Sequence, residues 1–175
     1  MIYEPREDSF LLAKYVRKYA KGAVLDMGTG LGILAEAAME NTKNVIAADI
    51  NAEAVSLARA KGISSVRSDL FSDVQGKFDL IIFNPPYLPE DNKEDEESRL
   101  STTGGKKGHE ILERFLAEAA KHLKDNGKIL IIASSLTGDV EKIMAKYSFK
   151  FKCLEQKKLF FEKLYVYLLN RSGDI

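Results

Sequence analysis

The sequence predicts an α/β fold with a mainly parallel β-sheet that an antiparallel hairpin closes at one edge. Short apolar runs alternate with segments of helical periodicity through most of the chain, which favours a parallel sheet. After residue 149 two β-like runs follow each other without a helix, which indicates the hairpin. The 175 residues fit one domain, with a helix in 1–20, an α/β core in 21–148 and the hairpin in 149–175.

The elements follow in order from the spacing of apolar residues. Pro5 suits the first turn of the opening helix, after which apolar residues repeat at helical spacing up to Tyr19. Strands are predicted at 23–27, 45–50, 65–67, 78–83 and 128–133, and helices at 33–39, 52–61, 111–123 and 140–147. The hairpin strands are predicted at 149–154 and 164–169, with Cys153 as a buried strand residue because it alternates with two phenylalanines.

Composition argues against several classes of function. Lysine plus arginine and aspartate plus glutamate both number 26, so the net charge is zero, which argues against a nucleic-acid partner. One cysteine and two histidines give no cluster of metal ligands, so no metal site is predicted. The longest apolar run, at 164–169, is too short to span a membrane, and the first eight residues lack a signal-peptide pattern. We therefore expect a cytoplasmic protein without a membrane partner.

An acidic residue and three alternating glycines form the turn after the first core strand. Residues 26–32 run Asp-Met-Gly-Thr-Gly-Leu-Gly, and glycine lets a ligand approach the backbone closely. Ligands of such sheets bind at the carboxyl ends of strands. Asp49 ends the second strand, where a carboxylate can accept ribose hydroxyls. Asp69 and Leu70 end the third, where a carboxylate can accept an adenine amino group.

Two classes of cofactor fit this glycine turn. Residues 30–35 satisfy the G-x-G-x-x-A pattern of dinucleotide sites. Asp26 favours the other class, because a carboxylate there repels a pyrophosphate and suits the amino group and sulfonium of S-adenosylmethionine. A single aspartate at such a place is also a common helix cap. Acidic residues at three strand ends together favour S-adenosyl-L-methionine.

The fourth strand runs into Asn84-Pro85-Pro86-Tyr87 and must end there, because proline cannot continue a central strand. A residue before proline is held extended, so the Asn84 side chain and the Pro85 carbonyl have fixed directions. Together they can accept both N–H groups of a planar nitrogen and aim its lone pair at a methyl donor. Tyr87 can supply an aromatic face. Asn-Pro-Pro is also an ordinary turn sequence, but its place after the acidic glycine turn favours catalysis.

These motifs resemble those of the HemK/PrmC-related glutamine N5-methyltransferases of peptide chain release factors, in their short archaeal and eukaryotic form. The pattern Tyr-Glu-Pro-x-Glu-Asp at 3–8 and Gly-Gly-Lys-x-Gly at 104–108 separate this family from other enzymes with Asn-Pro-Pro-Tyr. The resemblance implies a class I Rossmann-like methyltransferase fold with a seven-stranded, mostly parallel sheet. The implied contacts of S-adenosyl-L-methionine are Ser9, Asp26, Gly28, Gly30, Asp49, Ile50, Asp69, Leu70 and Asn84.

The resemblance also implies a substrate and a partner. The substrate would be the glutamine of the Gly-Gly-Gln motif in a release factor, with Asn84, Pro85 and Tyr87 as catalytic residues. The partner would be a small zinc-binding activator protein that pairs with the strand edge near Ser64–Arg67. Ser9 stands where relatives often have threonine, which keeps the hydroxyl.

An alternative function uses the same chemistry on a different substrate. An N6-adenine or N2-guanine methyltransferase acting on RNA or DNA would share Asn84-Pro85-Pro86-Tyr87, although the zero net charge argues against it. The acidic run Glu90–Glu97 fits either a solvated loop or a segment that orders over a substrate. Lys106 and Lys107 fit either a solvated loop or a contact with the substrate.

Overall fold

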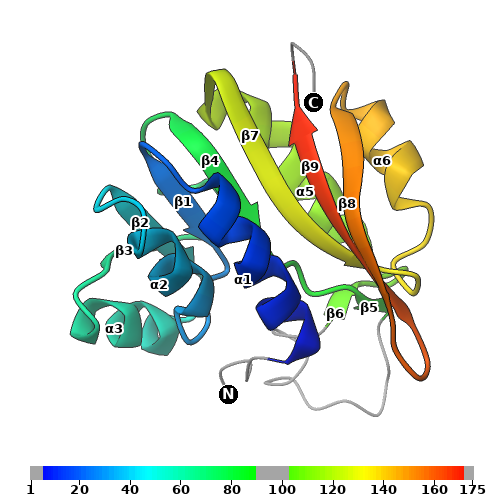
Figure 1. Ribbon diagram of the computed structural model, residues 1–175, viewed down its shortest axis with the longest axis horizontal. Helices are drawn as coiled ribbons and strands as arrows, with labels where there is room; N and C mark the ends of the chain where they lie inside the picture. Colours follow the sequence, from blue (N-terminus) through cyan, green and yellow to red (C-terminus); the bar gives the residue numbers. More distant parts are fainter. Residues whose placement is uncertain (1–5, 90–102, 172–175) are drawn as a thin grey trace.

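The computed structural model describes residues 6–89 and 103–171, which form a seven-stranded sheet with helices on both faces (Figure 1). The strands lie in the order β3-β2-β1-β4-β7-β9-β8, and β9 alone runs against the direction of the others. Their bounds are β1 Val24–Met27, β2 Val45–Asp49, β3 Ser64–Arg67, β4 Phe78–Phe83, β7 Leu123–Ser134, β8 Lys150–Lys158 and β9 Lys163–Asn170. This arrangement confirms the predicted mostly parallel sheet with an antiparallel C-terminal hairpin at its edge.

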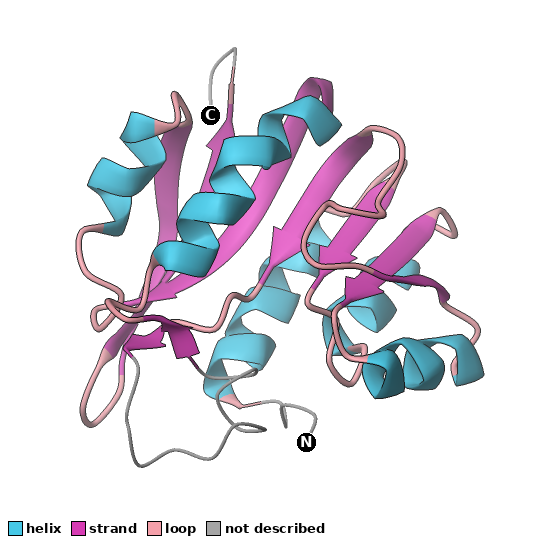
Figure 2. Cartoon of the chain, turned by 180° about the vertical axis from the view of Figure 1, so that it is seen from behind, coloured by secondary structure: helices cyan, strands magenta, loops and turns pink. Residues whose placement is uncertain are grey.

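Three helices cover one face of the sheet and two cover the other, as the two opposite views show (Figures 1 and 2). The first group is α1 Glu7–Tyr19, α2 Ile33–Met39 and α3 Ala52–Ala60, and the second is α5 Glu110–Ala119 and α6 Val140–Lys146. The central strands are therefore buried on both sides, which explains why β1 and β4 read as nearly unbroken apolar runs.

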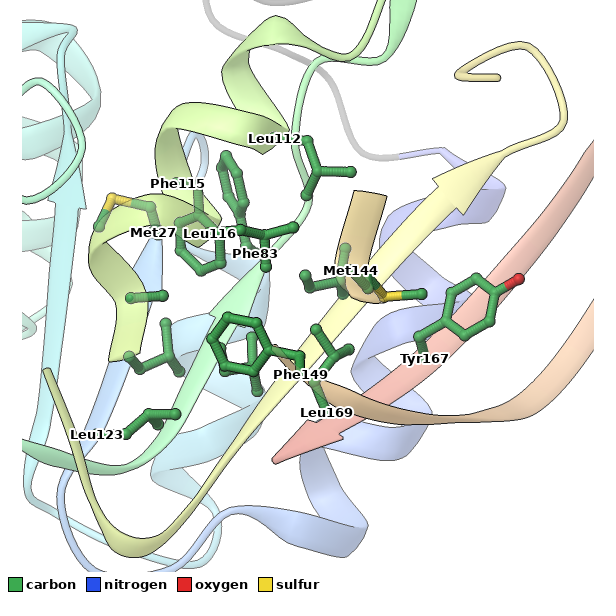
Figure 3. Packing of buried hydrophobic residues seen from close by; sticks show 14 of the residues in the cluster. Met27, Phe83, Leu112, Phe115, Leu116, Leu123, Met144, Phe149, Tyr167 and Leu169 are labelled. Atoms are coloured by element: carbon green, nitrogen blue, oxygen red, sulfur yellow. The ribbon is translucent and has the colours of Figure 1, made fainter. Parts of the chain in front are cut away.

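The packing under α5 and α6 centres on aromatic residues (Figure 3). Phe115 of α5 is fully buried, and its ring centroid lies 4.4 Å from that of Phe83 at the end of β4. This contact anchors the last residue of β4 before the chain turns into Asn84. The core thus fixes the strand end on which the reactive motif depends.

Two features of the structure differ from the predicted elements. Leu123 completes the apolar pattern of the predicted helix, yet α5 ends at Ala119 and a 3₁₀ turn, η1 (Ala120–His122), leads into β7 at Leu123. The structure also contains a two-stranded parallel pair, β5 (Leu88–Pro89) and β6 (Thr103–Gly105). Strands of two and three residues carry too little periodicity to be recognised in a sequence. The acidic run at 90–97 lies outside the described residues.

The prediction that Cys153 is buried is wrong. Its side chain is exposed, and it lies on β8, the last strand of the sheet, directly before a register shift between Cys153 and Glu155. Phe149 and Phe151 still pack against the core below α6, but the alternation ends there. A bulge of this kind turns the following residues away from their expected face.

Candidate active site

The predicted site residues meet at the carboxyl ends of β1, β2 and β4. β1 lies between β2 and β4, and the chain order reverses at this point of the sheet, which is where open α/β sheets bind ligands. No helix in residues 6–89 and 103–171 has both the length and the apolar character to cross a membrane. In the same residues no group of three or more histidine, cysteine or acidic side chains is placed to hold a metal ion.

The glycine turn after β1 is attached to the end of β2. The backbone N–H of Gly28 donates to the Ala48 carbonyl at 2.8 Å, and the N–H of Gly30 donates to Asp49 Oδ2 at 2.9 Å. Gly28 and Gly30 have φ angles of 68° and 52°, a region that residues with a Cβ rarely adopt. The turn therefore keeps its backbone close to the strand ends.

Asp49 sits at the centre of this edge. Its second carboxylate oxygen accepts the N–H of Asn51 at 2.9 Å, so two backbone donors hold the carboxylate in place. The side chain is half-buried, and each oxygen keeps capacity for a further hydrogen bond. Ile50, next in the chain, leaves 45% of its surface exposed beside it. A fixed acceptor next to an exposed apolar side chain suits a sugar carrying a flat aromatic base.

Asp26 lies entirely below the surface. Its Oδ2 accepts the hydroxyl of Thr29 at 2.7 Å and the N–H of Ala35 at 3.1 Å, which ties β1 to the turn and to α2. Burial raises the pKa of Asp26 to about 7, although both hydrogen bonds act in the opposite direction. Its Oδ1 has no hydrogen-bond partner among the described residues. The buried Asp26 carboxylate thus stabilises the turn through Oδ2, and its Oδ1 can still accept a hydrogen bond.

Asp69 and Leu70 follow β3 at the next strand end. Asp69 is exposed and pairs with Arg114 of α5 at 2.8 Å, so the described structure places its carboxylate in a surface ion pair. Leu70 adopts a left-handed φ of 50°, and the hydroxyl of Ser68 donates to its carbonyl at 2.6 Å. This unusual conformation turns the chain sharply after β3 and leaves the Leu70 side chain half-buried.

Asn84 is oriented by the first turn of α1. Its Nδ2 donates to Asp8 Oδ2 at 3.2 Å and to Ser9 Oγ at 3.3 Å, and the Tyr87 hydroxyl donates to the same Asp8 oxygen at 3.4 Å. The Asn84 Oδ1 is buried and has no hydrogen-bond partner among the described residues. Pro85, the next residue, is buried. The amide therefore turns its donors toward Asp8 and Ser9 and keeps an acceptor for a ligand.

Asp8 also lies in this candidate site, and sequence reasoning assigned it no role. It is only 2% exposed, yet in the sequence it reads as an ordinary acidic residue in the first turn of a helix, where the helix dipole favours negative charge. Two signals were available in the sequence: its place at the end of the Tyr-Glu-Pro-x-Glu-Asp pattern at 3–8, and its position beside Ser9, itself 4% exposed in the structure.

The Gly-Gly-Lys-x-Gly stretch lies against the reactive motif. A Cβ on Gly104 would meet the Gly108 carbonyl oxygen and stand 2.6 Å from the Pro86 carbonyl oxygen, so only glycine allows this contact. The Glu110 carboxylate accepts the backbone N–H of Lys107 at 3.0 Å and closes the loop. The exposed Lys107 side chain remains directed to solvent in the described structure, and its role stays a prediction.

Comparisons with known proteins identify relatives of this chain. Residues 7–161 match the model of the methyltransferase small domain. A Methanocaldococcus jannaschii protein, whose name assigns it provisionally to the protein N5-glutamine methyltransferases, is 43% identical over 94% of this chain and 89% of its own length. The release factor glutamine methyltransferase of Streptococcus pneumoniae is 35% identical over 62% of this chain and 44% of its own length. The ribosomal RNA small subunit methyltransferase C of Haemophilus influenzae is 32% identical over 71% of this chain and 36% of its own length.

Solved structures agree with this grouping. The E. cuniculi Mtq2–Trm112 complex, described as responsible for the methylation of the eRF1 translation termination factor, matches with a TM-score of 0.79 and 25% identity, over 98% of this chain and 99% of that chain. A ribosomal protein L11 methylase from Lactobacillus delbrueckii shares the fold with a TM-score of 0.67 and 24% identity, over 95% of this chain and 80% of that chain. The predicted class I methyltransferase fold is confirmed. Because the family model covers most of the sequence, the chain belongs to the methyltransferase small domain family.

Proposed function

We propose that this methyltransferase transfers a methyl group from S-adenosyl-L-methionine to the side-chain amide nitrogen of a glutamine, in the Gly-Gly-Gln motif of a peptide chain release factor. The observation that carries the proposal is the buried Asn84 Oδ1, which has no partner among the described residues. A primary amide offers two N–H donors, the complement of such an acceptor. The names of the M. jannaschii and S. pneumoniae relatives support the same substrate class.

The residues at the strand ends fit S-adenosyl-L-methionine by the chemistry of their polar groups. When bound, this cofactor supplies an electrophilic methyl group on a sulfonium. Asp49 would accept the ribose hydroxyls, since its two oxygens are already fixed by backbone donors. Ile50 would pack against the adenine, with Asp69 and Leu70 at the next strand end.

The amino-acid end of the cofactor would lie over the glycine turn. Gly28 and Gly30 would let it approach the backbone, and the leftover Asp26 Oδ1 would accept a cationic amino group. A nearby cation would also favour the ionised form of this carboxyl, whose pKa burial raises to about 7. Ser9 would contribute its hydroxyl from α1.

Catalysis by these residues would consist of orientation and electrostatic stabilisation. An amide nitrogen is a weak nucleophile because its lone pair is delocalised into the carbonyl. Asn84 Oδ1 and the Pro85 carbonyl would accept its two N–H groups and hold the nitrogen face toward the methyl donor. The nitrogen would form a bond to the methyl carbon as the bond from that carbon to sulfur breaks, which would leave a neutral thioether, and the nitrogen would give up one N–H proton to solvent.

Asp8 would strengthen this arrangement. Its carboxylate accepts from Asn84 Nδ2 at 3.2 Å, which polarises the asparagine amide and makes Oδ1 a better acceptor. Its negative charge would also favour the positive charge that develops on the substrate nitrogen. Tyr87 would keep Asp8 in place through its hydroxyl and offer its ring to the substrate.

A partner protein would complete the enzyme at the edge formed by β3. Within the described residues β3 pairs with β2 alone, and its residues are exposed or half-buried. A hollow of about 290 Å³ beside it is lined by Val66, Val74 and five neighbouring residues. An unpaired strand edge next to a hollow with both apolar and polar lining residues suits an added strand. We assign this edge to a small zinc-binding activator, and Trm112 in the E. cuniculi complex supports a partner.

Mass spectrometry of a release factor after incubation with this protein and S-adenosyl-L-methionine tests the proposal, with and without the activator. One added methyl group on the Gly-Gly-Gln glutamine, absent with Asn84→Ala, is the expected result. Parallel tubes hold RNA and DNA, because the H. influenzae relative is named for ribosomal RNA. Methylation of nucleic acid alone would replace this function with the base methyltransferase alternative. A release factor substrate places the enzyme in the cytoplasm.

A further inference from the structure

The turn between β8 and β9 presents two neighbouring phenylalanines to solvent. Phe160 and Phe161 are 92% and 87% exposed, more than any other large apolar side chain among the described residues. Their rings meet edge to face, with centroids 4.8 Å apart. We call residues 158–163 the hairpin tip. Paired aromatic side chains left fully in water are unusual on a folded surface and are typical of binding anchors.

Hydrogen bonds hold the hairpin tip in a fixed position. The N–H of Leu159 donates to the Glu162 carbonyl at 2.8 Å and closes the turn. Ser135, just after β7, donates its N–H to the Lys163 carbonyl at 2.8 Å and accepts the Lys163 N–H on its hydroxyl at 3.0 Å. The hydroxyl of Ser134 donates to the Glu162 carboxylate. The two rings are thus carried by a turn that is attached to the end of β7.

The hairpin tip projects from the same edge of the sheet as the active site. β4 and β7 are parallel, and Phe83 pairs with Ile131, so Asn84 lies level with Ile132 of β7. Ile132 pairs with Val166 of β9, which is five residues from Phe161. The path from Asn84 to the rings therefore crosses two strand spacings and follows five residues along β9, a separation of roughly 20 Å. Figures 1 and 2 both show this turn at the end of the molecule where β5 and β6 lie.

We infer that the hairpin tip docks the body of the protein substrate while its glutamine enters the active site. The inference rests on the proposed function. A glutamine and its immediate neighbours extend about 10 Å from Asn84, so a short peptide does not reach the rings, whereas a folded domain does. The partner surface would offer an apolar pocket for Phe160 and Phe161. Its rim would be acidic, since the exposed Lys157, Lys158 and Lys163 flank the rings.

Steady-state methylation of two substrates tests the inference, with the activator present throughout. The substrates are an intact release factor and a peptide of about seven residues containing Gly-Gly-Gln. The variant is Phe160→Ser/Phe161→Ser, and the matched control is Met39→Ser. Met39 is an exposed apolar residue at the end of α2, on the opposite edge of the sheet. We expect the double variant to lower kcat/KM for the release factor about tenfold to a hundredfold through KM, with unchanged kcat. The peptide and the control variant should show no change.

The binding step provides an independent readout. We expect the Asn84→Ala protein to bind the release factor without methylating it. When the two phenylalanine substitutions are added to Asn84→Ala, calorimetry should show the Kd for the release factor raised by the same factor. Equal kinetics and equal Kd with and without the two rings would overturn the inference. So would an equal loss on peptide and protein, because it would indicate damage to the fold. No methylation of the release factor by the unaltered protein would instead overturn the proposed function itself.

Discussion

Replacing Asp8 with alanine tests whether the direction of the Asn84 amide is imposed by its neighbours. Asp8 is the charged acceptor for Asn84 Nδ2, and Ser9 Oγ is a neutral second acceptor. Without Asp8, the amide is free to rotate by half a turn and exchange Nδ2 with Oδ1. An N–H group would then face the N–H groups of the substrate, and the nitrogen could not be held for reaction.

The size of the effect follows from the hydrogen-bond geometry. A hydrogen bond to a charged group contributes about 1.5–3 kcal/mol. The distances of 3.2 Å from Asn84 Nδ2 and 3.4 Å from the Tyr87 hydroxyl are longer than the usual optimum, which favours the lower part of that range. A loss of about 1.5–2 kcal/mol from the transition state corresponds to a fall in kcat of roughly tenfold to thirtyfold. Asp8→Asn keeps a neutral acceptor and should lose only about threefold to tenfold.

The assay is transfer of labelled methyl groups at saturating cofactor and release factor, with the cofactor Kd measured separately by calorimetry. The control is Glu7→Ala, which removes the exposed neighbouring carboxylate from the same helical turn. We expect Glu7→Ala to behave as the unaltered protein and Asp8→Ala to keep its cofactor Kd. A kcat for Asp8→Ala within twofold of the unaltered value would refute the role of Asp8. If kcat falls as far in Asp8→Asn as in Asp8→Ala, the effect does not depend on the strength of the hydrogen bond, and this explanation is refuted.

Three further changes have distinct signatures. Asp49→Ala should raise the cofactor Kd at least tenfold in calorimetry while kcat at saturation changes little, because in the proposed arrangement this carboxylate would hold the ribose and not the glutamine. Burial raises the folded-state pKa of Asp26 above its unfolded value, so this group makes the free protein less stable as pH rises from about 4 to 7, by up to about 4 kcal/mol. Urea unfolding at pH 5 and 8 should show about 2–3 kcal/mol of this loss in the unaltered protein, and Asp26→Asn should lack it. Gly104→Ala should lower kcat with little effect on the cofactor Kd, since the added carbon meets backbone oxygens that cannot rotate away.

The local elements of the core were predictable because the sequence signals are themselves local. The helix Ile33–Met39 and the strand Phe78–Phe83 have the predicted bounds, each set by glycine or proline at its end. The strand ends in turn placed Asp26, Asp49 and Asn84 on one edge of a parallel sheet. Topology alone therefore predicted which side chains gather at this edge.

The contacts that tune the site could not be predicted in the same way. Asp8 and Asn84 are 76 residues apart, and their hydrogen bond depends on how α1 packs across the end of β4. The β5–β6 pair likewise joins residues far apart in the chain. The sequence placed Asp26 at a strand end, but not the close packing of the turn against α2 that buries its carboxylate and leaves Oδ1 without a partner among the described residues. Such contacts depend on tertiary packing, and a short stretch of sequence carries no information about it.

The described donors and acceptors of the site explain why its glycine pattern does not make a dinucleotide site. The donors are used internally: Gly30 donates to Asp49, Thr29 to Asp26, and Asn84 to Asp8. The oxygens left over are acceptors, two of them buried and without a partner among the described residues. A pyrophosphate would bring only acceptors and negative charge to this edge, whereas an ammonium group, ribose hydroxyls and a primary amide bring donors. The direction of the hydrogen bonds, more than the spacing of the glycines, therefore selects a methyl donor and an amide nitrogen.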